Sequence, residues 1–119
     1  MTPAAVANIR ALDPPKRSKV ESAWEQVGPV YIAAEFEARV VWTAYEPVSL
    51  RLPGGWYKVD FVHVLETGQM VFVEVKSRRG GYGYTNSRTK IHAAAEVYPF
   101  WTFVQATGNS RGFELETIT

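Results

Sequence analysis

The chain has no cysteine among its 119 residues, and it has only two histidines. Disulfide bonds and thiolate zinc sites are therefore excluded, and an imidazole zinc site is disfavoured. The apolar runs are too short to span a bilayer, and the N-terminus shows no charged-then-apolar leader. We therefore expect a cytoplasmic protein with no membrane partner. The sequence also lacks a P-loop, a dinucleotide fingerprint and a Ser-His-Asp set.

The chain has little net charge, since 13 basic residues and 12 acidic residues leave only +1. The distribution of charge is more informative than the total. Residues 76–90 hold five basic side chains and no acidic one, and residues 10–19 hold four basic side chains against one aspartate. Basic segments beside a group of carboxylates suit an enzyme that binds a polyanion and a metal ion. Solvated loops are the alternative interpretation of either segment.

What is present is a globular composition, with 46% hydrophobic and 13% aromatic residues. We predict an N-terminal arm over residues 1–16 and one domain over residues 17–119. The periodicity predicts an α/β fold with a mixed β-sheet flanked by helices. The first expected element is a helix from the N-cap Ser18 to about Ala38, with a break or kink at Gly28-Pro29. Strands are expected at 40–46, 48–52, 56–65 and 69–77, followed by a helix from Asn86 or Ser87 to Val97. The last two strands are expected at 101–105 and 113–118, with a turn at 107–112 between them.

Two of these strands carry the acidic residues on which the functional argument rests. The run 56–65 contains Asp60, and the run 69–77 contains Glu74 and Lys76. A turn signal at 66–68 predicts that the two runs pair as an antiparallel hairpin. Alternation along a strand places Glu74, Lys76 and Phe72 on one face, with the valines at 71, 73 and 75 facing a core. Pairing can then bring Asp60 beside Glu74.

Two adjacent carboxylates repel each other unless a cation lies between them. A hard divalent ion with oxygen ligands suits such a pair, and Lys76 can orient or deprotonate a water beside it. The structural alternative is an ordinary charged strand face, on which Asp60 pairs with Lys58 or His63. By alternation His63 faces away from Asp60, so we interpret it as a packing or surface residue.

Asp60, thirteen intervening residues and Glu74-Val75-Lys76 form the pattern D…ExK. This pattern resembles the core motif of the PD-(D/E)xK nucleases, whose fold is a restriction-endonuclease-like core. The succession of segments is similar to small phage endonucleases, including the endonuclease I type of Holliday junction resolvase. The segments that carry this similarity are Arg17–Glu21, Trp42–Pro47, Tyr57–Phe61, Phe72–Ser77 and Lys90–Phe100, within roughly residues 17–105.

The resemblance implies an active site of Glu21, Asp60, Glu74 and Lys76. Asp60, Glu74, the Val75 carbonyl and Glu21 would bind Mg²⁺, for which Mn²⁺ would substitute. This sequence departs from the family pattern at Val59, where proline is usual, and at Ser77, where glycine is usual, but neither position supplies a catalytic side chain. Glu21 also fits a capping box with Ser18, and Glu35 and Glu37 are rival helix carboxylates.

The implied activity is a metal-dependent DNA endonuclease that leaves a 5′-phosphate and a 3′-hydroxyl. Branched DNA is the expected substrate and a homodimer the expected assembly, because cutting two strands needs two sites. The cellular location would be the host cytoplasm if the gene belongs to a phage. The alternatives are a nuclease for flap, nicked, single-stranded or duplex DNA, and a non-catalytic DNA-binding protein. The residues predicted to contact DNA are Arg17, Arg78, Arg79, Tyr82, Tyr84, Arg88 and Lys90, with solvated loops and ordinary packing as alternatives.

Overall fold

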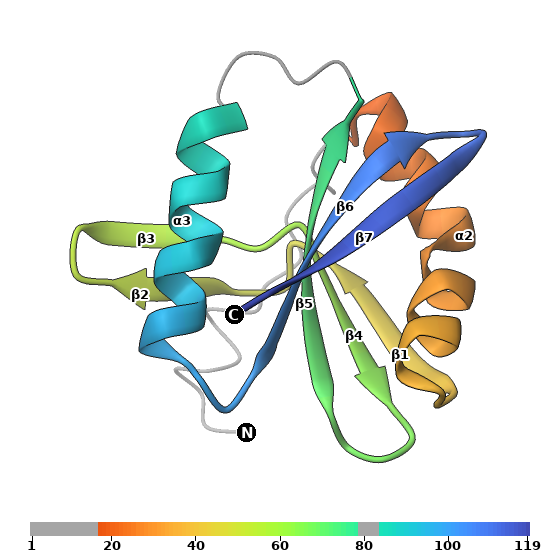
Figure 1. Ribbon diagram of the computed structural model, residues 1–119, viewed down its shortest axis with the longest axis horizontal. Coiled ribbons are helices and arrows are strands. Elements are labelled where there is room, and N and C mark those ends of the chain that lie inside the picture. The colour runs from red at the N-terminus through yellow and green to blue at the C-terminus, as the bar shows by residue number, and fades with distance from the viewer. Residues whose placement is uncertain (1–16, 79–83) are drawn as a thin grey trace, which may run out of the picture.

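The computed structural model describes residues 17–78 and 84–119. The predicted arm, Arg79 and Tyr82 lie outside the described residues. The elements in chain order are α2 (Lys19–Phe36), β1 (Val40–Tyr45), β2 (Ser49–Leu52), β3 (Gly55–Lys58), β4 (Phe61–Leu65), β5 (Met70–Ser77), α3 (Tyr84–Val97), β6 (Thr102–Asn109) and β7 (Gly112–Ile118) (Figure 1).

Five strands form one mixed sheet in the order β1-β4-β5-β6-β7, and β2 and β3 form a separate hairpin. The pairs are antiparallel except for β5 and β6, which are parallel and are joined through α3. The predicted α/β architecture, with a mixed sheet and flanking helices, is confirmed. Neither helix among the described residues combines the length and apolar character needed to cross a bilayer.

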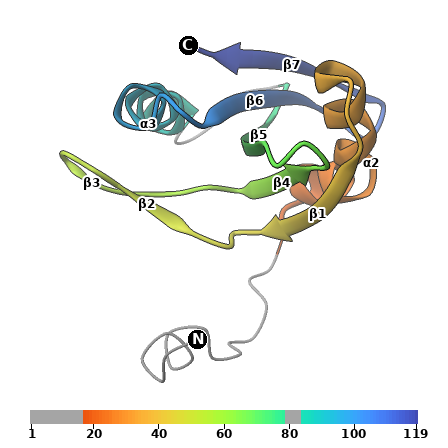
Figure 2. The same cartoon turned by 90° about the horizontal axis from the view of Figure 1, so that it is seen from below.

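The sheet separates two hydrophobic cores. One core lies under α2, where Trp24 and Ile32 meet the three valines of β5. The other lies under α3 and the β2–β3 hairpin, where Phe72 meets Ile91 and Phe103. Figure 2 shows α2 at one end of the molecule and α3 with the hairpin at the other. The predicted alternation along β5 is therefore confirmed, because its valines and Phe72 enter opposite cores.

Of the predicted break or kink at Gly28-Pro29, the break is wrong, since α2 is continuous through Pro29. Proline removes one backbone donor from the helix. Trp24 and Ile32 are nonetheless fully buried on the two sides of this point. Most helical stability in a protein comes from packing of the apolar face, and here that packing outweighs the lost bond. The helix ends at Phe36 and is capped by Glu37, which has a left-handed backbone with φ 52°.

The predicted single strand over residues 56–65 is also wrong. It divides into β3 and β4 at Val59-Asp60, directly across from the Glu46-Pro47 bend between β1 and β2. Pro47 has no N–H to donate to a ladder. Glu46 adopts φ 45°, and its N–H donates to the carbonyl of Asp60 at 2.7 Å. The two antiparallel chains thus leave the main sheet together as β2 and β3, while the predicted hairpin across the turn at 66–68 is formed by β4 and β5.

Two further boundaries differ from the sequence predictions. β6 continues through residues 107–109, where the sequence predicts a turn, because Thr107 and Gly108 pair with both β5 and β7 and Asn109 pairs with β7. The turn is confined to Ser110-Arg111. Helix α3 begins at Tyr84, ahead of the predicted cap at Asn86 or Ser87.

Candidate active site

The predicted site residues converge where four elements meet. The end of β1 lies beside the start of β4 through the pair Tyr45–Phe61, and β4 lies beside β5 through the pair Phe61–Val73. Continuing this register by one residue places Asp60 opposite Glu74. Helix α2 begins at the same end of the sheet, because Glu21 in its first turn accepts a hydrogen bond from Tyr45. The predicted neighbourhood of Asp60 and Glu74 is therefore formed.

Asp60 occupies the bend between β3 and β4. Its Oδ2 accepts the N–H of Val75 at 2.8 Å, which fixes the carboxyl group against β5. Burial, followed by repulsion from Glu74 and Glu21, raises the pKa of Asp60 to about 8. The Val75 N–H and the Lys76 ammonium oppose this shift. Burial and the neighbouring carboxylates thus disfavour the ionised form of Asp60 more than the Val75 N–H and the Lys76 ammonium favour it.

Glu74 is almost completely buried, with 4% of its surface exposed. Its Oε2 accepts the hydroxyl of Tyr57 at 2.8 Å, and its Oε1 lies 3.3 Å from the ammonium of Lys76. Burial and the Glu74 charge raise the pKa of Tyr57, so this hydroxyl keeps its proton and remains a donor. Glu74 is therefore held by one neutral donor and one cation.

Glu21 makes the capping box that the sequence predicts. Its Oε1 accepts the N–H of Ser18 at 2.9 Å, and its own N–H donates to the Ser18 hydroxyl at 3.2 Å. The same Oε1 accepts the Tyr45 hydroxyl at 3.2 Å. Burial and the charge of Glu21 raise the pKa of Tyr45. Glu21 is thus both a cap and a charged neighbour of Asp60, while Glu35 and Glu37 lie at the other end of α2.

Sequence reasoning missed Tyr45 and Tyr57, the two hydroxyl donors of the site. Strict alternation from Asp60 places Tyr57 on the opposite face of the strand. The break at Val59-Asp60 interrupts this alternation, so Tyr57 turns inward from the hairpin to reach Glu74. The only signal of this break is Pro47, which lies in the bend between β1 and β2 and is distant from residues 59 and 60 in the sequence.

The carboxylates of Asp60 and Glu74 supply part of the ligand set that a magnesium ion needs. Within the part of the chain that the structure describes, no three histidine, aspartate or glutamate side chains gather closely enough to hold a metal by themselves. Magnesium usually keeps several waters and is bound through one or two carboxylates and substrate phosphates. The adjacent Asp60 and Glu74, with the raised pKa of Asp60, meet that requirement. They would hold the ion together with the Val75 carbonyl, and Glu21 would add charge from α2.

The structural alternatives for Asp60 are not formed. Lys58 pairs with Glu46 at 3.9 Å instead. His63 is fully buried, where its Nε2 accepts the Trp24 indole N–H at 3.0 Å and its Nδ1 lies 2.8 Å from the Thr43 hydroxyl. The interpretation of His63 as a packing residue is confirmed. Burial lowers the pKa of His63 to about 4, so its ring is neutral near pH 7.

Four of the basic residues predicted to contact DNA lie in the described part of the chain, and each has a partner within it. Arg17 binds Glu25, and its guanidinium lies 4.3 Å from the centre of the Tyr45 ring. Arg78 donates to the carbonyl of residue 112 at 3.2 Å. Arg17 thus lies at the carboxylate cluster, whereas Arg78 extends from the end of β5 towards β7.

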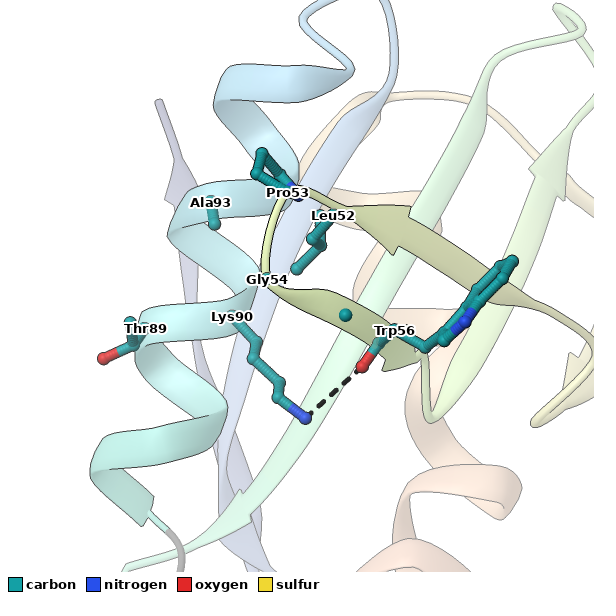
Figure 3. A pocket seen from close by; sticks show the side chains of 8 residues that line it. Leu52, Pro53, Gly54, Trp56, Thr89, Lys90 and Ala93 are labelled. Carbon is teal, nitrogen blue, oxygen red and sulfur yellow. Dashed lines mark hydrogen bonds between the residues drawn. The ribbon is translucent and has the colours of Figure 1, made fainter.

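The other two basic residues lie on α3. Arg88 makes two hydrogen bonds of 2.9 Å to Glu116 and one to Gln105. Lys90 donates to the Trp56 carbonyl at 3.3 Å across an open pocket of about 300 Å³ between α3 and the hairpin (Figure 3). Tyr84 begins α3, and its side chain lies outside the described parts of the structure.

No protein-family model matches the chain, and neither a curated protein nor a solved structure matches it significantly. The nuclease resemblance therefore stays a prediction that rests on the motif residues and on the way the fold brings them together.

Proposed function

We propose that the protein is a magnesium-dependent endodeoxyribonuclease. The proposal rests on the arrangement of Asp60, Glu74 and Lys76. The two carboxylates are neighbours, and the Lys76 ammonium lies beside that of Glu74. A purely structural ion pair needs one acid and one base. Here a second, buried acid is present whose pKa is raised to about 8, which is typical of a functional site.

The roles of the residues follow from their contacts. Asp60 and Glu74 would supply oxygen ligands from two neighbouring strands, and the Val75 N–H bond keeps the Asp60 carboxyl group oriented. Bound magnesium supplies neutralising charge at a phosphate and lowers the pKa of an attacking water. Lys76 would orient that water from its position beside Glu74. Cleavage of the bond between phosphorus and the 3′-oxygen then yields a 5′-phosphate and a 3′-hydroxyl.

Branched DNA is the substrate we propose, because the motif resembles that of junction resolvases. A symmetric homodimer would supply two sites for two strands. Arg17 lies beside the cluster, since its guanidinium covers the Tyr45 ring. It would hold a phosphate next to the one that is cut.

The first experiment incubates the protein and Mg²⁺ with four-way, flap, nicked, duplex and single-stranded DNA of matched length. We expect cleavage, with the four-way junction cut fastest. Asp60→Asn and Glu74→Gln should each reduce cleavage by about a hundredfold or more, because each removes a proposed ligand charge. DNA binding should survive or tighten, since a repelling carboxylate has gone.

The matched control is Glu66→Gln in the turn between β4 and β5, at the far end of the same two strands. This variant should cleave as the wild type does. Calorimetry should detect Mg²⁺ binding to the wild type and the control but not to Asp60→Asn. Full cleavage by Asp60→Asn or Glu74→Gln would reject the site. DNA binding without cleavage of any substrate would favour the non-catalytic alternative.

A further inference from the structure

The β2–β3 hairpin has two chemically different faces. Leu50, Leu52 and Tyr57 face inward, and all three are buried in the core under α3. The outward face carries exposed side chains paired across the strands. These pairs are Ser49 with Lys58 and Arg51 with Trp56.

Trp56 is the unusual member of this outer face, because 58% of its surface is exposed. Figure 3 shows its indole ring pointing away from α3, while its backbone carbonyl accepts the Lys90 ammonium. The guanidinium of Arg51 lies 5.5 Å from the centre of the ring, which places a cation beside an open aromatic surface. A tryptophan that stabilised the core would instead face inward with Tyr57.

The outer face leads directly to the carboxylate cluster. Lys58 ends β3 two residues before Asp60, and its ammonium reaches Glu46 at 3.9 Å. Glu46 donates its N–H to the Asp60 carbonyl, so the two bends are in contact. Tyr57, between Trp56 and Lys58, binds Glu74 from the inner face. A strand bound on the outer face would therefore lie close to the proposed scissile phosphate.

We propose that this outer face binds an unpaired segment of DNA, with a base stacked on Trp56 and phosphates held by Arg51 and Lys58. The inference rests on the proposed nuclease function and adds a reason for selectivity. Two cations and an exposed ring, with no acidic residue among the four outward side chains of β2 and β3, are complementary to a polyanion with open aromatic bases. A fully paired duplex keeps its bases stacked on each other and offers none to Trp56.

The test measures binding by the full-length chain carrying Asp60→Asn, so that bound DNA stays uncut. The substrates are a single strand, a four-way junction with unpaired bases at its centre, and a fully paired duplex of the same length. Trp56→Ala should weaken binding to the first two by about tenfold or more, the contribution of one base–aromatic stack, and should leave duplex binding nearly unchanged. Trp56→Phe should restore most of the loss, and Trp56→Leu should not.

The matched control is Trp42→Ala, because Trp42 on β1 is 51% exposed but lies in a separate apolar groove with Val48 and Trp101. This control should bind every substrate as the background chain does. Arg51→Ala and Lys58→Ala should each reduce the salt dependence of single-strand binding by about one phosphate contact. Melting temperatures of all variants establish that the hairpin remains folded.

Three outcomes would overturn the inference. One is unchanged binding by Trp56→Ala, another is an equal loss for duplex and single strand, and the third is full rescue by Trp56→Leu. The result is independent of the cleavage test. If the wild type cuts no DNA while Trp56→Ala still loses single-strand binding, the nuclease proposal fails and the binding surface stands. If Mg²⁺-dependent cleavage is observed and Trp56→Ala binds normally, only the surface is rejected.

Discussion

Single residues in this protein carry more than one role at the carboxylate cluster. Glu21 is the clearest case, since its Oε1 accepts both the Ser18 N–H and the Tyr45 hydroxyl. Its charge also contributes to the raised pKa of Asp60. Hydrogen bonding and charge can be separated at this position, because a glutamine retains the acceptor oxygen and loses only the charge.

Glu21→Gln should therefore leave the melting temperature nearly unchanged and lower the rate of Mg²⁺-dependent cleavage by about tenfold or more. The physical reason is that glutamine still caps α2 and still accepts from Tyr45. Cleavage rates at saturating Mg²⁺ and thermal melting of the same samples provide the measurement. The control is Glu35→Gln, at an exposed position near the other end of α2. Normal cleavage together with a lowered melting temperature would assign Glu21 to the cap alone.

Helix α2 is the element that closes one face of the sheet and presents Glu21 at the site. The packing of α2 against the sheet depends on Trp24, which is fully buried and whose indole N–H donates to His63. Gly28 lies one turn further along the helix and leaves room for the indole. A Cβ at residue 28 would lie 2.4 Å from Cε2 of Trp24, which is closer than packed atoms allow.

Gly28→Ala should destabilise the fold by about 1–3 kcal/mol through overpacking. Helix propensity alone predicts the opposite sign, because alanine favours a helix over glycine by about 1 kcal/mol. Proline at 29 adds to the cost, since a Cβ before proline disfavours helical backbone angles. Denaturant unfolding of the variant and of Ala34→Gly, at an exposed position of α2, checks the two terms separately. A more stable Gly28→Ala variant would show that Trp24 can move aside.

At the scale of the whole molecule, two buried groups give opposite pH dependences to folding. The pKa of Asp60 is raised to about 8, so its ionisation weakens the fold as the pH rises from about 4 to about 8. The pKa of His63 is lowered by burial from 6.5 to about 4. As the pH falls, the unfolded chain takes up the His63 proton at a higher pH than the folded chain does. The stability that comes from burying the neutral His63 ring is therefore complete above about pH 6.5 and is lost as the pH falls to about 4.

The His63 contribution can be isolated with His63→Gln, whose amide can accept from Trp24 and donate to Thr43. The difference in unfolding free energy between wild type and variant should shrink by about 3 kcal/mol from pH 7 to pH 4, since one pKa unit corresponds to about 1.4 kcal/mol. Asp60 is present in both proteins, and its contribution cancels. Denaturant unfolding across this pH range is the measurement, and parallel curves for the two proteins would contradict it.

Local residue patterns by themselves determined the α/β class, the Ser18 cap with Glu21, the β4–β5 turn and the alternation along β5. These features depend on neighbours within a few residues, so periodicity and capping chemistry are enough to predict them. The proximity of Asp60 and Glu74 could also be predicted from the sequence, because the turn between β4 and β5 sets the pairing register of these two strands.

Only the tertiary structure decided that α2 continues through Pro29 and that the run 56–65 bends at Asp60 into two strands. Packing of Trp24 and Ile32 on the sheet outweighs the local break signal in α2. The bend at Asp60 depends on its contact with the Glu46-Pro47 bend, and no local pattern contains this contact because the two bends are distant in the sequence. That bend turns Tyr57 inward to Glu74 and Trp56 outward to solvent, because adjacent residues of a strand face opposite sides.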